Sequence, residues 1–212
     1  MSRRPRGRRN PPARRRPPGV ESTLRIIGGD WRGRRLPVTV ADGLRPTPER
    51  VRETLFNWLA PRILGARCLD LFAGTGALGI EALSRGAAHV QFVDSDRQAI
   101  ASIRDTLSTL DATDRATLTL GDALRVSIAA PAPELVFIDP PFARHLHGEA
   151  LDAIFAMLAP HARVYLEYPA AEAAAIQSLL AGRAQVLREK RAGQVGYCLA
   201  QPARDGEDDG LP

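Results

Sequence analysis

Short apolar segments alternate with longer amphipathic segments from residue 67 to residue 200, and this alternation constrains the fold more than any other feature. We expect strands at 68–72, 88–93, 116–120, 135–138 and 162–167, with helices near 77–85, 97–110, 122–129, 148–158 and 170–181. Strands that alternate with helices form βαβ units around a mainly parallel sheet. Two final strands near 184–190 and 195–200 flank Gly193, which predicts a terminal hairpin whose last strand runs antiparallel. We therefore expect a doubly wound α/β fold.

Composition divides the chain into four parts. Residues 1–22 are rich in Arg and Pro and nearly lack apolar side chains, so we expect a disordered tail. The sequence leaves open whether this tail only keeps the protein in solution or also attracts phosphates. Residues 23–62 form an amino-terminal extension, 63–201 form the main α/β domain, and 202–212 form an acidic tail that we also expect to be disordered.

The extension is expected to contain a β ribbon and one helix. Residues 24–27 and 31–40 flank a pair of glycines and predict the ribbon. We expect Thr47 to be the N-cap of the helix that follows, with Pro48 at the first helical position. The apolar stripe of this helix consists of Val51, Leu55, Trp58 and Leu59, and Arg50 and Arg52 lie off it.

Excess positive charge is confined to the amino-terminal part of the chain. The formal net charge is +5 at pH 7, but residues 1–20 alone carry +8 and residues 21–62 carry +3. The remaining segments are net acidic, with −3 for 63–200 and −3 for 201–212. A basic segment on an otherwise acidic chain favours contact with nucleic acid. Only one of the 29 basic residues is a lysine, which is also typical of a biased genomic base composition, so this argument depends on charge position.

Several classes of protein are disfavoured by the sequence. No uninterrupted apolar stretch approaches the roughly 20 residues that cross a bilayer, and no Cys/His cluster has the spacing of a zinc site. We therefore expect neither membrane insertion nor a metal. Cys68 and Cys198 lie inside apolar segments and are expected to be buried, reduced thiols. The Arg- and Pro-rich start lacks the apolar core of a secretory signal, so we expect a cytoplasmic location.

A glycine turn, Asp70-Leu-Phe-Ala-Gly74-Thr-Gly76-Ala-Leu-Gly79, joins the first expected parallel strand to the first helix. Its Gly-x-Gly-x-x-Gly spacing is typical of turns that bind nucleotide-containing cofactors, but it does not identify the cofactor by itself. Asp70 helps to choose among such cofactors. A carboxylate near the turn would repel the pyrophosphate of a dinucleotide and would attract a cationic ligand. S-adenosylmethionine carries an ammonium and a sulfonium group, so the sequence favours it over a dinucleotide.

Further candidate cofactor-binding residues end the next two strands. Asp94 can accept hydrogen bonds from both ribose hydroxyls, whereas Asp96 is expected to cap the following helix. Asp122 can accept from an adenine amine or act as another N-cap, and we prefer the ligand role. The expected cofactor-binding set is Asp70, Phe72, Ala73, Gly74, Gly76, Asp94, Ser95, Asp122 and Ala123.

The sequence Asp139-Pro140-Pro141-Phe142 follows the apolar strand at 135–138 and is the candidate catalytic turn. An exocyclic base amine is a poor nucleophile, because its lone pair is delocalised into the ring. The Asp139 carboxylate and the Pro140 carbonyl can accept both amine hydrogens and so favour a pyramidal nitrogen, while the prolines donate no competing N–H. Phe142 would stack on the base. The alternative is a structural diproline turn with Phe142 in the core.

The turns at 70–76 and 139–142 resemble those of class I S-adenosylmethionine-dependent methyltransferases that act on amino groups. RIIGGDWRGRRL at 25–36, LRPT at 44–47, RVRETLFNWL at 50–59 and REKRAGQVGY at 188–197 are similar to the bacterial small-subunit ribosomal RNA guanine-N2 methyltransferases. The resemblance implies a Rossmann-like, seven-stranded sheet, S-adenosyl-L-methionine as cofactor, and 16S rRNA of the small ribosomal subunit as partner. It also implies RNA contact by the basic residues of the extension: Arg25, Arg32, Arg34, Arg35, Arg45, Arg50 and Arg52.

Other functions are compatible with the same motifs. Asp-Pro-Pro-Phe suits any planar exocyclic amine, so an adenine-N6 methyltransferase acting on DNA or RNA is the main alternative. A non-catalytic RNA-binding assembly factor and a nicotinamide-dependent enzyme are the others. We expect a monomer, with His145 and His147 on a surface loop, whereas Glu167 is either structural or substrate-facing.

Overall fold

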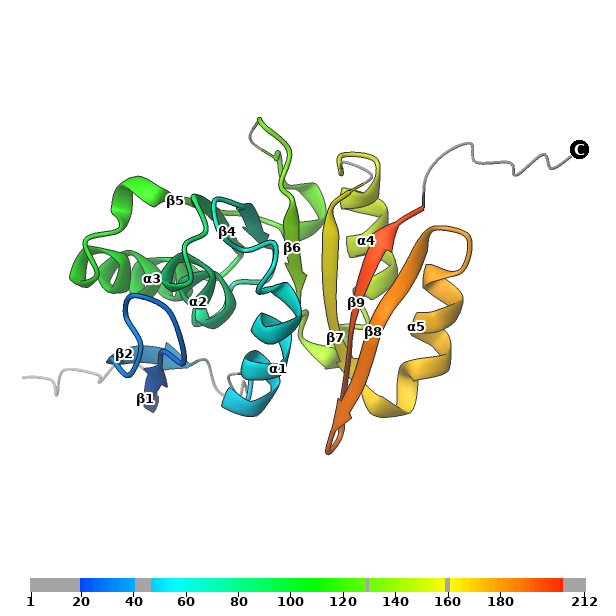
Figure 1. Cartoon of the computed structure of the whole chain (residues 1–212), viewed down its shortest axis with the longest axis horizontal. Coiled ribbons are helices and arrows are strands. Elements are labelled where there is room, and N and C mark those ends of the chain that lie inside the picture. Colours follow the sequence, from blue (N-terminus) through cyan, green and yellow to red (C-terminus); the bar gives the residue numbers. More distant parts are fainter. Residues whose placement is uncertain (1–19, 41–46, 129, 159–160, 204–212) are drawn as a thin grey trace, which may run out of the picture.

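The computed structural model describes residues 20–40, 47–128, 130–158 and 161–203 (Figure 1). Within these residues, seven strands form one sheet in the order β5-β4-β3-β6-β7-β9-β8. The strands are β3 (Arg67–Asp70), β4 (His89–Asp94), β5 (Ala116–Leu120), β6 (Leu135–Ile138), β7 (Arg163–Pro169), β8 (Ala184–Ala192) and β9 (Val195–Pro202). β3 to β7 are mutually parallel, and β9 runs antiparallel to both of its neighbours. The predicted seven-stranded, mostly parallel sheet with an antiparallel final strand is confirmed.

Helices cover both faces of this sheet (Figure 1). Residues of α1 (Glu49–Leu59), α2 (Ala77–Ser84) and α3 (Arg97–Thr109) belong to one core cluster, and residues of α4 (His147–Phe155) and α5 (Ala173–Leu180) belong to the other. The helix expected near 122–129 is instead a single 3₁₀ turn at Ala123–Arg125. The architecture is therefore a sheet between two helical layers, as the sequence predicts.

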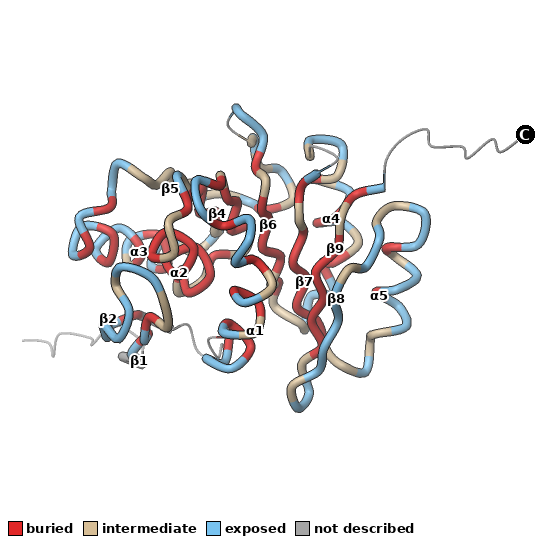
Figure 2. The backbone as a smooth tube through the Cα atoms, viewed as in Figure 1, coloured by how far each residue is buried: buried red, intermediate tan, exposed pale blue. Residues whose placement is uncertain are grey.

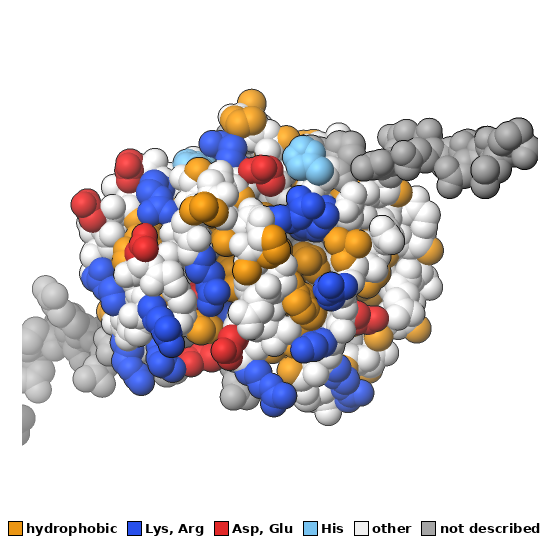
Figure 3. Space-filling model, in the orientation of Figure 1, with side chains coloured by type: hydrophobic (Ala, Val, Ile, Leu, Met, Phe, Trp, Pro, Cys, Tyr) orange, Lys and Arg blue, Asp and Glu red, His pale blue; other side chains and the backbone are white. Residues whose placement is uncertain are grey.

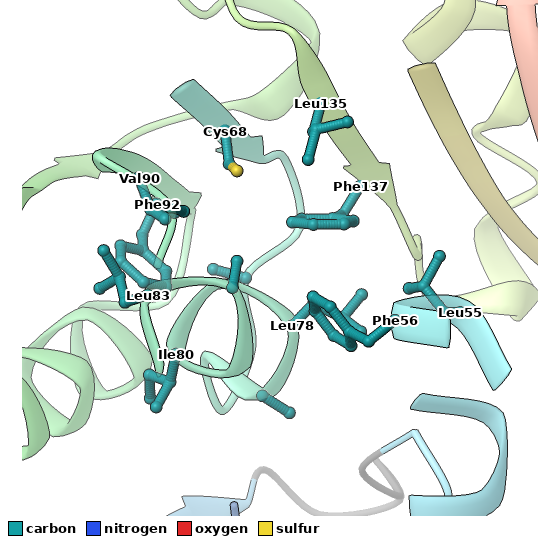
Figure 4. Packing of buried hydrophobic residues seen from close by; sticks show 14 of the residues in the cluster. Leu55, Phe56, Cys68, Leu78, Ile80, Leu83, Val90, Phe92, Leu135 and Phe137 are labelled. Carbon is teal, nitrogen blue, oxygen red and sulfur yellow. The ribbon is translucent and has the colours of Figure 1, made fainter. Parts of the chain in front are cut away.

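The two cores follow from the period-two geometry of the strands. In β6, the Phe137 side chain points into the α1–α2 core and Ile138 points into the α4–α5 core. Phe137 packs against Phe56 of α1, with ring centroids 6.0 Å apart (Figure 4). The central strands are buried nearly throughout (Figure 2), which is why they read as continuous apolar segments in the sequence.

The extension forms a separate ribbon and a helix. β1 (Val20–Arg25) pairs antiparallel with β2 (Arg35–Val40), which confirms the predicted ribbon. β1 starts at Val20, so the last residues of the predicted tail lie in a strand. Residues 1–19 and 204–212 are outside the described residues, and the predicted disorder of both tails stays a prediction.

The beginning of α1 differs from the prediction. The helix starts at Glu49 with Pro48 at the N-cap position, and no side chain caps it. The prediction of Thr47 as the N-cap is therefore wrong. The Thr47 hydroxyl instead donates a hydrogen bond of 3.1 Å to the Oδ2 atom of Asp139. This contact joins residues that are 92 positions apart, so local capping patterns cannot reveal it.

Glu81 of α2 is fully buried and joins the extension to the sheet domain. Its carboxylate accepts hydrogen bonds from the main-chain N–H groups of Ile27 and Gly28, at 2.9 and 2.8 Å. The same carboxylate pairs with Arg85 at 2.8 Å and with Arg52 of α1 at 3.4 Å. Because a buried charge is tolerated only when it is paired and hydrogen-bonded, these contacts favour one arrangement of ribbon, α1 and α2.

We expect the substitution Glu81→Gln to lower the free energy of unfolding by about 3–5 kcal/mol, because it leaves Arg52 buried without an ionised partner. The Arg52 and Glu81 side chains are only 3% and 0% exposed. Urea denaturation would show this as a lower midpoint at an unchanged slope. The matched control is Glu49→Gln, which breaks the Arg25–Glu49 pair, 49% and 51% exposed, and should cost less than about 1 kcal/mol. Equal losses in the two variants would contradict the anchoring role of Glu81.

Candidate functional site

The two sequence motifs meet at one edge of the sheet. After β3 the chain moves outward to β4 and β5 and then returns to β6 on the other side of β3. The strand order therefore reverses between β3 and β6, and ligands of open α/β sheets bind at the carboxyl ends of strands at such a point. Asp70 ends β3 and Asp139 directly follows β6. The structure thus brings the glycine turn and residues 139–142 together.

The glycine turn leaves open space above its backbone. Gly74 and Gly76 have φ angles of +52° and +75°, in the left-handed region that favours glycine. A Cβ atom at Gly76 would lie 3.0 Å from the side chains of Ile80 and Ile103, so packing also requires a glycine there. A Cβ at Gly74 would meet nothing nearer than the carbonyl oxygen of Phe72 at 3.9 Å. Within the described residues, a ligand can therefore approach the backbone at Gly74.

Two predicted ligand carboxylates also hold the turn in place. Asp94 accepts hydrogen bonds from the N–H of Gly74 at 2.7 Å and from the N–H of Asp96 at 2.8 Å. Asp70 accepts one from the N–H of Gly79 at 3.0 Å. Each ionised carboxylate oxygen has two lone pairs, so Asp94 retains capacity for a ribose hydroxyl. Its ligand role stays a prediction.

Asp70 is buried at the base of the turn, and its environment suits a cationic ligand. Burial raises the pKa of Asp70 to about 8, the Gly79 hydrogen bond lowers it, and the charges of Asp139 and Asp94 raise it. A positively charged ligand near Asp70 would favour the ionised carboxylate. The residues present therefore fit a sulfonium- and ammonium-bearing cofactor better than a pyrophosphate.

Two aspartates that follow β4 and β5 act as N-caps, and the other predicted cofactor residues differ in their burial. Asp96 caps α3 by accepting from the Gln98 N–H at 2.8 Å, as predicted. Asp122 caps the 3₁₀ turn after β5 through the Leu124 N–H at 3.0 Å, and its preferred ligand role stays a prediction. Phe72 is half-buried, Ala73 and Ala123 are buried, and Ser95 is exposed.

Residues 139–142 form a partly open turn after β6. The Asp139 side chain is half-buried, and burial raises its pKa to about 6, while the hydrogen bond from Thr47 lowers it. Pro140 is buried, and Pro141 and Phe142 are half-buried. Phe142 belongs to neither of the two core clusters of the described residues. This placement favours a ligand-facing Phe142 over the alternative of a core residue.

Glu167 is a further acid at the same edge of the sheet. The parallel pairing of Ile138 with Leu166 places Asp139 beside Glu167, one residue further along. Glu167 accepts a hydrogen bond of 2.8 Å from the Tyr165 hydroxyl. Burial, and then the charge of Asp139, raises the pKa of Glu167 to about 8. In the sequence, Glu167 can be noticed because it is a carboxylate inside an otherwise mainly apolar strand.

The two histidines after the turn differ in position. His145 is exposed, as expected, and its Nδ1 lies 3.1 Å from Glu172. His147 is buried, and its Nε2 donates to the main-chain carbonyl of Glu167 at 2.8 Å. The expectation of a surface position for His147 is wrong, because a buried carbonyl at the end of β7 needs a donor. Burial lowers the pKa of His147.

The chain is similar in sequence to known bacterial proteins. The model of a family described as conserved hypothetical protein 95 matches residues 24–201. Over 189 residues the chain is 45% identical to the ribosomal RNA small subunit methyltransferase D of Escherichia coli, covering 88% of this chain and 93% of that protein. The chain belongs to this methyltransferase D family.

Other members support the assignment and the fold. The methyltransferase D of Haemophilus influenzae is 38% identical to this chain, and the alignment covers 87% of this chain and 96% of that protein. The solved structure of the yhhF protein from Escherichia coli is 43% identical, with a TM-score of 0.74 and coverage of 85% of this chain and 98% of that chain. Together with the strand order, this similarity shows the Rossmann-like fold of class I methyltransferases.

In this family member the basic residues predicted to contact RNA have three different placements. Arg25, Arg32, Arg34, Arg35 and Arg50 are exposed. Arg45 lies outside the described residues. Arg52 is buried against Glu81 and donates to the carbonyl of Arg25 at 3.0 Å, so its expected RNA contact is not supported. Figure 3 shows Lys and Arg side chains over both the β1–β2 ribbon and the β8–β9 hairpin.

The part of the chain that the structure describes has neither a helix suited to cross a membrane nor a group of side chains suited to hold a metal ion. None of its helices is both long enough and apolar enough to cross a membrane. In the same residues, no three His, Cys, Asp or Glu side chains are grouped so that they could hold a metal ion.

We expect Thr47→Val to raise the pKa of Asp139 above its value of about 6, by roughly one unit, because it removes a hydrogen bond to the charged form. NMR titration of the Asp139 carboxyl carbon would measure the change. The control is Thr54→Val in the adjoining helix α1, which removes a hydroxyl that donates to the carbonyl of Arg50 and should leave this pKa unchanged. An unaltered pKa in Thr47→Val would show that the hydroxyl does not stabilise the carboxylate.

Proposed function

We propose that this protein transfers a methyl group from S-adenosyl-L-methionine to the exocyclic N2 amine of a guanine in 16S rRNA of the small ribosomal subunit. The observation that carries the proposal is the meeting of the open glycine turn with residues 139–142 where the strand order reverses. The family assignment supports it, since the named relatives are ribosomal RNA small subunit methyltransferases. The choice of N2 comes from the sequence resemblance.

The glycine turn would bind S-adenosyl-L-methionine, which supplies a methyl group activated on a positively charged sulfur. Asp70 would stabilise that positive charge from below the turn, and the space at Gly74 would admit the ligand. Asp94 would accept from the ribose and Asp122 from the adenine. The residues proposed to line the rest of the pocket are Phe72, Ala73, Gly76, Ser95 and Ala123.

Residues 139–142 would hold and activate the amine. The Asp139 carboxylate and the Pro140 carbonyl would accept the two N2 hydrogens and leave the nitrogen lone pair directed at the methyl group. The bound cofactor would supply the methyl group and keep the electron pair of its sulfur–carbon bond, and Asp139 would accept the N2 proton that the methylated amine loses. Phe142 would stack on the base, contributing roughly 1–3 kcal/mol. Most of the acceleration would come from orientation and from electrostatic stabilisation.

The basic side of the extension is proposed to bind the RNA around the target. Contacts between Arg side chains and phosphates give affinity without reading sequence. The proposed residues are Arg25, Arg32, Arg34, Arg35 and Arg50, which are exposed, together with Arg45. A guanine in structured RNA must be splayed out of its stack before its amine can reach the turn.

Methylation of small ribosomal subunits lacking the modification, followed by nucleoside mass spectrometry, tests cofactor, substrate and target atom together. We expect N2-methylguanosine from the wild type, and a rate lower by about 10²–10³-fold for Asp139→Asn, which loses the ionised acceptor. Asp114→Asn is the matched control, because Asp114 is exposed in the turn before β5, at the opposite edge of the sheet. Formation of N6-methyladenosine would instead support the adenine-N6 alternative.

We expect Asp70→Asn to weaken S-adenosyl-L-methionine binding about tenfold without destabilising the protein at pH 7. The folded pKa of about 8 exceeds the ordinary 3.8, so the folded state binds more protons between these values and stability falls as pH rises through them. An asparagine side chain does not ionise, so the substitution removes this pH-dependent loss of stability. Its amide oxygen can still accept the hydrogen bond from the Gly79 N–H. Calorimetry and urea denaturation measure the two effects. If binding and stability fell together, Asp70 would be a structural residue instead.

A further inference from the structure

Glu167 is a buried acid for which the proposed methyl transfer provides no role. It is only 4% exposed and lies in β7 among the apolar side chains of Val164, Tyr165, Leu166 and Tyr168. Burying a carboxylate is unfavourable unless it is paired or fully hydrogen-bonded. Buried acids with perturbed environments in a cleft are concentrated at functional sites. The position of Glu167 in the site therefore requires an explanation.

The sheet register places Glu167 beside Asp139 and on the same face. Phe137 pairs with Tyr165 and Ile138 pairs with Leu166. Because side chains alternate along a strand and parallel neighbours lie about 4.8 Å apart, the next residues, Asp139 and Glu167, project to the side of Phe137 and Tyr165. Two carboxyl groups thus lie next to each other at the edge where the base would bind.

The surroundings of Glu167 leave this pair of acids without a counter-ion. Facing it are Asp139 from β6, Tyr165 from its own strand, and its register partner Tyr197 from β9. His147 of α4 reaches the main-chain carbonyl of Glu167 and not its carboxylate. Within the described residues, Tyr165 is the only donor to this carboxylate, and neither acid forms an ion pair with Lys or Arg. The pair thus has acceptor capacity available for a ligand.

Guanine carries the complementary groups on its Watson–Crick edge, where N1–H and the N2 amine are adjacent donors. Adenine presents its N6 amine next to N1, which is an acceptor. Two ionised carboxylates accept from both guanine groups, whereas adenine N1 would face the lone pairs of a carboxylate. When both carboxyl groups are ionised, which for Glu167 means above a pKa of about 8, adjacent acceptors on β6 and β7 match guanine and oppose adenine.

We propose that Glu167 accepts a hydrogen bond from guanine N1–H while Asp139 and Pro140 hold N2, so that Glu167 selects guanine over adenine. The inference rests on the proposed function and specifies how its site recognises the base. Sites that hydrogen-bond a substrate N–H discriminate strongly against analogues that lack it, because their own polar groups are then left unpaired. A protonated carboxyl would present an O–H donor to the guanine N–H groups, so we expect kcat/KM to rise with pH as the pair loses its proton.

The test compares wild type with Glu167→Gln, which keeps the size of the side chain and removes its charge. We expect kcat/KM for methylation of the small subunit to fall by roughly ten- to a hundredfold. We also expect the rise of kcat/KM to shift to lower pH, where Asp139 alone titrates, and S-adenosyl-L-methionine binding to stay unchanged. Glu189→Gln is the matched control, because Glu189 also accepts from a tyrosine hydroxyl, that of Tyr168 at 2.6 Å, but is exposed.

The outcomes separate the inference from the proposed function. A wild type that forms no N2-methylguanosine would overturn both. Two results would overturn the inference alone, provided that the wild type is active. In the first, Glu167→Gln has an unchanged kcat/KM. In the second, Glu167→Gln is less stable but its pH profile is unchanged. If Glu167→Gln does not fold, Glu167→Asp keeps the charge but shortens its reach. Lower kcat/KM with the wild-type pH midpoint would then support the inference, and wild-type kcat/KM would refute it.

Discussion

The buried carboxylate of Glu81 is the interaction on which the rest of the arrangement depends. It accepts hydrogen bonds from the glycine loop after β1, from Arg52 of α1 and from Arg85 at the end of α2. These donors come from three segments that are distant in sequence, and a fully buried charge is stable only while its partners are present. One carboxylate thereby fixes the extension on the α/β domain. It also removes Arg52 from the surface, so the proposed contact with RNA would depend on the exposed Arg residues of the extension.

The position of α1 has a direct consequence for residues 139–142. Phe56 of α1 packs against Phe137 of β6, and Thr47, just before α1, donates to Asp139. The extension is therefore part of the site as well as a basic surface, because it contributes to the charge state of Asp139. A displacement of α1 would remove a hydrogen bond from this acid and raise its pKa. If the ribbon binds RNA as proposed, that binding and the protonation of Asp139 would be physically connected through α1.

Features that follow from local patterns were predictable from the sequence, and contacts between distant segments were not. β6 has the predicted bounds, Leu135–Ile138, because a buried strand is a short apolar run between polar turns. The half-buried strand β5 also has its predicted bounds, Ala116–Leu120, and its apolar residues alternate with threonines. Thr47 has the local signature of an N-cap, yet its partner is 92 residues away, and Arg52 lies off the apolar stripe but pairs with a buried acid. Such pairings are decided by tertiary packing. Glu167 is the exception, because a charged residue within an otherwise apolar strand can be noticed in the local sequence.

Three acids, Asp70, Asp139 and Glu167, converge on one face of the sheet edge, and burial raises the pKa of each of them. Buried carboxylates without cations are unfavourable, and within the described residues none of the three forms an ion pair with Lys or Arg. The presence of these acids is explained if the substrates supply the groups that pair with them. A cationic methyl donor beside Asp70 and a base with two adjacent N–H donors beside Asp139 and Glu167 would supply the charge and hydrogen bonds that the chain lacks. The electrostatics of this site are therefore complementary to those of the proposed ligands.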